Sequence, residues 1–139
     1  MALAFNKFRA FAQDIGRKVH NLNSDTIKFA LSNTAPANTN AVLADITQIT
    51  AANGYSSGGS ACTGVSYTQV AGTATLAATQ PTFTASSGTI GPFQYIVAYN
   101  STASGGPLIG WWDRGGALTL QDTDTYTPTL GASGILTLA

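Results

Sequence analysis

The spacing of apolar residues changes near residue 25 of this 139-residue chain. Before that point, apolar side chains recur every three or four residues, as on one side of an α-helix. This stripe consists of Phe8, Phe11, Ile15, Val19 and Leu22. The segment "NLNS" then ends the helix, because Asn and Ser side chains offer the backbone competing hydrogen bonds. The pattern predicts an amphipathic helical segment over residues 1–24.

From residue 25 the period becomes two, which is typical of strands. In "DTIKFALSNT" the apolar Ile27, Phe29 and Leu31 alternate with less apolar neighbours. Further short strands, rich in Thr and Val or Leu, are predicted at 62–70, 72–78, 81–85, 117–121, 125–130 and 134–139. The stretch "AVLADITQI" fits either a short helix or a strand. Six to eight short strands separated by Gly and Ser turns predict an antiparallel β-sandwich for residues 25–139, with a jelly roll as one form of it.

The most apolar strand is predicted in "GTIGPFQYIVAYN", residues 88–100. Alternation places Phe93, Tyr95, Val97 and Tyr99 on one face. The opposite face is also mostly apolar, which predicts a central strand covered on both sides. We expect "PLIGWWD" to pair back against it and "RGG" to turn the chain again.

Two adjacent tryptophans, Trp111 and Trp112, lie in this returning strand. Consecutive side chains of a strand point to opposite faces, so the two rings cannot form one flat platform for a sugar. One ring is expected in the sandwich core. The other is expected on the outer face, against the N-terminal helix or a neighbouring subunit, and alternation alone does not decide which is which.

Charge is scarce and unevenly distributed. Charged residues make up 9% of the chain, against about 25% in typical proteins, and the formal net charge is +0. Residues 1–28 hold five cations and two Asp, a balance of +3, while the remainder has one Arg and four Asp, a balance of −3. So little charge favours a surface covered by partners, as in an assembly protein. The basic N-terminal segment either packs on its own sheet or docks on a neighbouring subunit.

Catalytic chemistry finds little support in the residue types present. His20 is the only histidine and Cys62 the only cysteine. The sequence therefore has neither the spaced His and Cys ligands of a zinc site nor a recognisable nucleophile–base pair. The pair of carboxylates in "DTD", residues 122–124, is interpreted as a turn. Asp113 beside Arg114 is interpreted as a structural ion pair. We predict no enzyme activity, no catalytic, metal or cofactor-binding residues, and no cofactor.

Two classes of partner are not expected. Most aromatic residues lie in the neutral-to-acidic body, apart from the basic segment, which disfavours nucleic-acid binding. No apolar run approaches the ~20 residues needed to span a bilayer, and the N-terminus does not match a signal peptide. The expectation is a protein of cytosolic origin that binds neither nucleic acid nor membrane.

Four stretches together carry a resemblance: "KVHNLNSDTIKFALSNTAP", "NGYSSGG", "GTIGPFQYIVAYN" and "PLIGWWD". Over most of its length the chain resembles small structural proteins of tailed-bacteriophage virions, most closely capsid decoration, or cement, proteins. The resemblance implies a non-enzymatic protein that binds the outside of a phage capsid and stabilises contacts between capsomers. Its implied location is the virion, assembled in the host cytoplasm, and its partners would be the major capsid protein or other virion subunits. A tail, neck or fibre subunit is the alternative, followed by a carbohydrate-binding module.

A homo-oligomer, a dimer or a trimer, is also expected. The residues predicted to contact partners are basic or aromatic and lie in the N-terminal segment or in the tryptophan pair. They are Phe5, Lys7, Phe8, Arg9, Phe11, Arg17, Lys18, Trp111 and Trp112.

Overall fold

The computed structural model describes residues 3–130 and 134–139. The fold is mainly β, with 44% strand and 8% helix, and its sheets are antiparallel, which confirms the predicted class at this level. In chain order the elements are β1 (Asn6–Lys7), α1 (Arg9–Gly16), β2 (Ile27–Ser32), the 3₁₀ turn η1 (Leu43–Asp45), β3 (Ser60–Ala61), β4 (Thr63–Val70), β5 (Thr73–Thr79), β6 (Phe83–Thr84), β7 (Ile90–Asn100), β8 (Leu108–Leu120), β9 (Thr125–Tyr126) and β10 (Leu136–Leu138). No helix in the described ranges is long and apolar enough to cross a bilayer.

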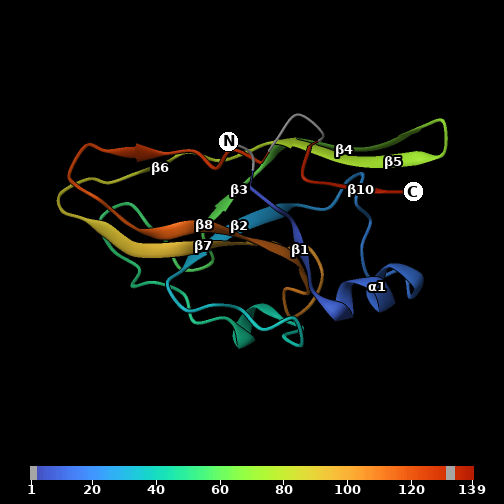
Figure 1. The fold of residues 1–139 in the computed structure, drawn as a ribbon, viewed down its shortest axis with the longest axis horizontal. Helices are drawn as coiled ribbons and strands as arrows, with labels where there is room; N and C mark the ends of the chain where they lie inside the picture. Colours follow the sequence, from blue (N-terminus) through green and yellow to red (C-terminus); the bar gives the residue numbers. More distant parts are fainter. Residues whose placement is uncertain (1–2, 131–133) are drawn as a thin grey trace.

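Strands that are distant in sequence pair to form three sheets. The largest has the order β1-β8-β7-β2-β3, the second β10-β5-β4, and the third contains β6 and β9. Figure 1 shows the first sheet as one layer, with the two smaller sheets stacked above it. This order does not confirm a jelly roll.

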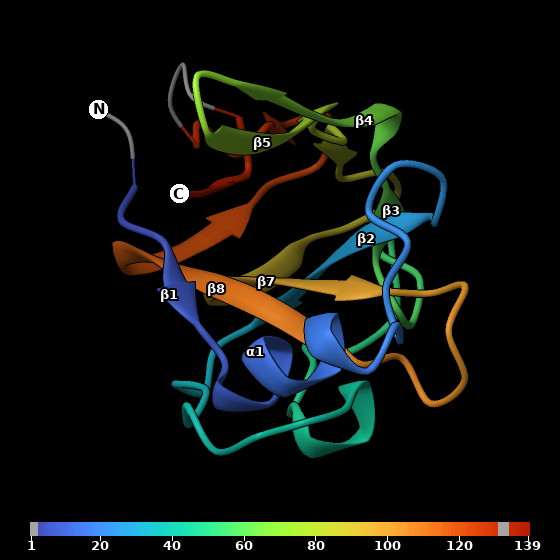
Figure 2. The ribbon, with the colours of Figure 1, turned by 90° about the vertical axis from the view of Figure 1, so that its right-hand side faces the viewer.

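The five-stranded sheet is covered on both faces. Figure 2 shows β4 and β5 above it, and α1 and the loop with η1 below it. The main core lies between the β layers and includes Ile27, Phe29, Leu31, Leu76, Phe83, Phe93, Ile96, Ile109 and Trp112. The second core, under the sheet, consists of Phe8, Ala30, Ile46, Val97, Tyr99 and Leu108. Residues 96–100 of β7 are all buried, so the prediction of a strand covered on both sides is confirmed.

The N-terminal helix is shorter than predicted. It covers Arg9–Gly16 within the predicted segment 1–24, of which residues 1–2 lie outside the described ranges. Lys18 adopts a left-handed conformation (φ 64°), and two backbone bonds close a Schellman motif, Val19 N–H to Asp14 O at 2.9 Å and Lys18 N–H to Ile15 O at 3.2 Å. The apolar stripe therefore continues beyond the helix in irregular backbone.

The predicted turn at "RGG" is wrong, because β8 runs through it. Tyr95 pairs with Asp113 and Phe93 with Leu118, so residues 114–117 of β8 lie opposite Gln94 alone. Such an insertion is a bulge, which bends a strand without reversing it. Gly115 takes a positive φ of 90° within it.

The predicted face of Phe93 in β7 is wrong, and the reason is the same irregularity. Simple alternation put Phe93 together with Val97 and Tyr99, whereas Phe93 joins Ile96 in the main core and the other two lie in the second core. The register shifts between Phe93 and Tyr95, and a one-residue shift moves a side chain to the other face.

Candidate interaction surfaces

Trp112 is the tryptophan that fills the main core. Its side chain is 0% exposed. Its ring lies 5.4 Å from that of Phe5 and 5.5 Å from that of Phe29, as centroid distances. Burying such a ring is among the larger single contributions to stability. Trp112 is therefore a core residue in this chain, although it belongs to the set predicted to contact partners.

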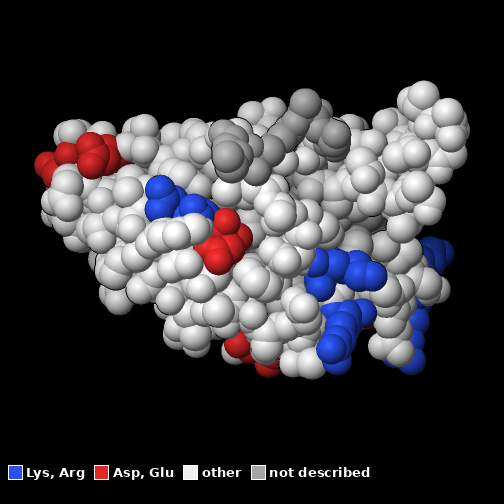
Figure 3. All heavy atoms as spheres, viewed as in Figure 1, with Lys and Arg blue, Asp and Glu red and all other residues white. Residues whose placement is uncertain are grey.

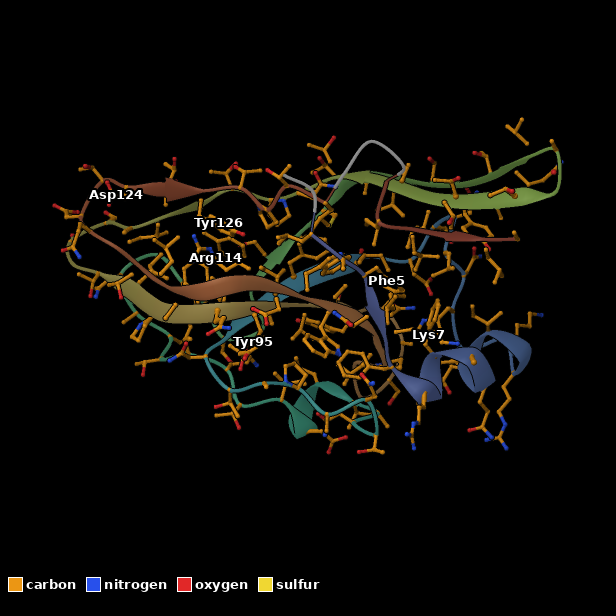
Figure 4. All side chains as sticks on the ribbon, viewed as in Figure 1. Phe5, Lys7, Tyr95, Arg114, Asp124 and Tyr126 are labelled. Atoms are coloured by element: carbon orange, nitrogen blue, oxygen red, sulfur yellow. The ribbon has the colours of Figure 1, made fainter. Side chains whose placement is uncertain are left out.

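Trp111 lies on the opposite face of β8 and is half-buried beside the second core. Its Nε1 donates to Asn38 Oδ1 at 3.2 Å, and the Tyr95 ring meets it edge-on at 5.9 Å. Figure 4 labels Tyr95 on the lower face of the sheet. The two rings point to opposite faces, as expected, and offer no shared platform for a sugar.

The N-terminal aromatic residues pack within their own chain. Phe8 is 0% and Phe11 3% exposed, and the Phe11 ring lies 5.3 Å from the His20 ring. Phe5 is half-buried against Trp112. A partner could reach Phe8 or Phe11 only if they left the two cores, so the segment packs in cis.

The cations of the predicted set remain at the surface. Lys7, Arg9, Arg17 and Lys18 are exposed, and Figure 3 shows basic side chains gathered at the end of the molecule that carries α1. Acidic side chains lie at the far end in the same view, where Figure 4 labels Asp124, and also near the middle and at the lower edge of the molecule. In this view the end that carries α1 is therefore basic and the far end acidic.

A long uncharged stretch separates these ends. Residues 46–112 contain no Lys, Arg, Asp or Glu, and they form β3 to β7 and the start of β8. This run is visible in the sequence, but our interpretation weighed only the balance of charge between the two parts of the chain. Its importance depends on which of these strands reach the surface.

Strands β4, β5 and β10 bring small uncharged side chains to the outer face of the upper layer. Tyr67, Leu76 and Leu136 form one row across the three strands and contribute to the main core. The next row, Thr68, Thr75 and Thr137, points the other way by alternation. This outer row is polar but uncharged.

His20 belongs to a buried polar cluster at the base of the loop 20–25. Asn100 Nδ2 lies 2.7 Å from Asp25 Oδ2 and 3.1 Å from His20 Nδ1. Asn100 Oδ1 accepts the backbone N–H groups of Thr102 and Ala103, at 2.9 and 3.2 Å. The orientation of this amide is fixed by those bonds, so its NH₂ group faces both Asp25 and His20.

It follows that His20 accepts at Nδ1 and carries its proton on Nε2. The Nε2 atom is buried without a partner in the described structure. Burial lowers the pKa of His20 below its usual 6.5, while the charges of Asp14 and Asp25 oppose that shift. A second proton on Nδ1 would face the Asn100 donor, so this geometry favours neutral imidazole. The cluster ties the loop to β7, and no nucleophile lies within it.

Other reactive side chains are buried or occupied. Burial raises the pKa of the Cys62 thiol to about 12 and that of Tyr55 to about 12. Asp122 Oδ1 accepts the Ser87 N–H and Asp124 Oδ2 the Gln121 N–H, both at loop positions, as the turn interpretation expects. No group of three His, Cys or Asp side chains suitable for a metal occurs in the described residues.

The ion pair predicted between Asp113 and Arg114 is replaced by other contacts. Asp113 Oδ1 accepts from Gln94 Nε2 at 2.9 Å and from the Gly115 N–H at 2.7 Å. The Arg114 guanidinium donates to Gly116 O and lies 5.7 Å from the Tyr126 ring centre. Neighbours in a strand point apart, which separates these two charges; Figure 4 shows Arg114 beneath Tyr126.

The geometry therefore presents two contrasting surfaces, a basic end around α1 and an uncharged outer sheet. Comparison with known proteins assigns no function to either surface. No protein-family model, no curated protein and no solved structure matches this chain.

Proposed function

We propose that the protein is a non-enzymatic structural subunit of a tailed-phage virion, a head decoration protein that binds the outside of the capsid and stabilises contacts between capsomers. The observation that carries this proposal is the separation of its surface into a basic end and an uncharged β layer. The phage assignment itself rests on the sequence resemblance.

Each surface suits a different kind of contact. Exposed cations at Lys7, Arg9, Arg17 and Lys18 attract an acidic partner surface and orient the encounter. The uncharged layer can be covered without stripping water from ions, which is the costly part of burying a charged face. A subunit that must be held between others benefits from both properties.

The architecture supports the same proposal. Two β layers around one main core are consistent with the sandwich body expected of such proteins. The jelly-roll form remains a prediction. A tail, neck or fibre subunit would use the same surfaces, so location on the particle separates it from decoration.

The test uses particles assembled with a tagged copy of the full chain. Decoration predicts many copies distributed over the head in electron micrographs, and confinement to the tail would establish the alternative. Absence from purified particles would overturn the virion assignment altogether.

Binding to undecorated shells tests the basic end. Reversing Lys7, Arg9, Arg17 and Lys18 to Glu should weaken binding roughly tenfold or more, since each exposed ion pair contributes up to about 1 kcal/mol and 1.4 kcal/mol is a factor of ten. The matched control, Asp122→Asn with Asp124→Asn at the far end, should bind like the wild type. Equal binding by both variants would contradict a role for the basic end.

A further inference from the structure

Strand β4 is an edge strand of the upper layer, with an irregular register between Thr63 and Ser66 and a regular one from Ser66 to Val70. Among the described residues its sheet partner is β5 alone, and its sequence, TGVSYTQV, contains no charge and no proline. Natural proteins usually protect such edges with charges, proline or covering elements, because a free edge is a template for another strand. Figure 1 shows the β4–β5 hairpin projecting beyond the five-stranded sheet.

The direction of the backbone groups on this edge follows from one hydrogen bond. The Tyr67 N–H donates to Asn23 Oδ1 at 3.2 Å, so it points away from β5. The register with β5 is regular from Ser66 to Val70, and backbone groups alternate between the two sides of a strand. The N–H and C=O of Gln69 therefore also point outward.

At Tyr67 the edge is covered by one side chain, that of Asn23. Asn23 belongs to the loop 20–25, and its side chain is exposed. The loop borders a cavity of about 280 Å³, lined in part by Ile15, Leu22 and Tyr67. A strand arriving at this edge has to displace Asn23 and replace the hydrogen bond that its side chain accepts from Tyr67.

We propose that β4 pairs in antiparallel fashion with β4 of a second copy, about a two-fold axis beside Tyr67. Each Tyr67 N–H then donates to the Tyr67 carbonyl of the other copy, and Gln69 lies opposite Val65. The two upper layers join into one six-stranded sheet, in the order β10-β5-β4-β4-β5-β10. On the outer face, the threonine row of each copy meets Ser66 of the other copy at the junction.

The charge pattern identifies the occupant as a second copy. Two-fold pairing brings Tyr67 opposite its own symmetry mate, and Ser66 and Thr68 next to theirs, so a charge at any of these central positions would lie close to a like charge. Neither β4 nor β5 carries a charge. Val70, which is 78% exposed at the end of β4, comes beside the first residues of the other strand and loses water contact.

This self-association does not depend on capsid binding. A dimer that fails to bind shells would contradict the proposed function only, and a monomer that binds shells would contradict the strand pairing only.

Disulfide cross-linking between cysteine variants of the full chain tests the register of the proposed pairing. Pairing centred on Tyr67 places Ser66 opposite Thr68 of the other copy in a close, non-hydrogen-bonded pair. Under mild oxidation, a mixture of the Ser66→Cys and Thr68→Cys proteins should form a disulfide heterodimer faster than either protein alone. The control replaces Thr68→Cys by Thr75→Cys, on β5, whose neighbours on both sides belong to its own chain. Equal rates in all mixtures would overturn the proposal; the native Cys62 is buried and does not interfere.

A backbone variant gives an independent measurement. Gln69→Pro removes an outward N–H that makes no bond to β5, and proline is tolerated at such edge positions. In sedimentation experiments we expect a shift from twice the monomer mass to the monomer mass. Gln69→Ala keeps the N–H but also loses the side-chain bond to the Gly72 N–H, so it is the matched control and should remain a dimer. A dimeric Gln69→Pro protein, or a monomeric wild type in the millimolar range, would contradict strand pairing.

Discussion

The N-terminal segment and the β4–β5 hairpin lie at the same end of the molecule (Figure 1) but use their side chains in opposite ways. The segment has little regular secondary structure, yet Phe8 and Phe11 anchor it in the two cores. The hairpin is regular from Ser66 to Val70, yet its tip and its edge, apart from the Asn23 contact at Tyr67, remain uncovered. The difference shows that an amphipathic stripe identifies what a chain must bury, whereas a free surface is defined by which strands lack a neighbour.

The strongest test of this contrast removes an anchor from the segment. Phe8→Ala should lower the free energy of unfolding by about 3–5 kcal/mol, because a ring with no solvent exposure leaves a cavity in the second core. Chemical denaturation measures the loss.

The matched change in the hairpin is Val70→Ala. Since Val70 is largely exposed, it should alter the free energy of unfolding by no more than about 0.5 kcal/mol. If Phe8→Ala costs as little as Val70→Ala, the segment is not anchored in cis and the comparison fails.

The two regions meet at the loop 20–25, whose stability should depend on pH. Folding lowers the pKa of His20, so the unfolded chain binds more protons as the pH falls below 6.5. The stability supplied by neutral His20 is complete above that pH and decreases below it, until the lowered pKa of the folded state is passed. Unfolding measured at pH values on either side of 6.5 should show this decrease.

His20→Gln is the matched variant for the pH experiment. Its amide oxygen can still accept from Asn100 but does not titrate, so the pH dependence near 6.5 should disappear. Because the loop carries Asn23, the protection of the Tyr67 amide against hydrogen exchange, relative to an unfolded chain at the same pH, should also decrease at low pH in the wild type and not in the variant. Unchanged exchange would separate the His20 cluster from the β4 edge.

Local patterns in the sequence predicted much of the fold. Period two placed Ile27, Phe29 and Leu31 in the main core, and alternation placed Trp111 and Trp112 on opposite faces. The mainly β class followed from the number of such segments.

What the sequence did not reveal is non-local or conformational. The bulge at residues 114–117 depends on the pairing of β8 with β7, so "RGG" alone resembled a turn. The edge position of β4 is set by which strands pair across the whole chain, and TGVSYTQV has no distinguishing residue. The aromatic residues were predicted to contact partners because of their residue type. Residue type does not indicate whether a ring is buried within its own chain.

A small gain in stability is expected from a change at the point where α1 ends. Lys18 has a φ of 64°, a left-handed conformation that costs an L-residue roughly 1–2 kcal/mol and glycine little. Lys18→Gly should therefore raise the free energy of unfolding by about 0.5–1 kcal/mol, after part of the gain is lost to the greater freedom of glycine in the unfolded chain. Arg17→Gly, at an ordinary φ of −89°, supplies the control and should lower it. If both changes lower stability equally, the Schellman motif does not end the helix, and the segment is held by Phe8 and Phe11 alone. If the prediction holds, Lys18 occupies a strained position that glycine fills better, and shell binding by the stabilised variant then measures what its ammonium group contributes to the basic end.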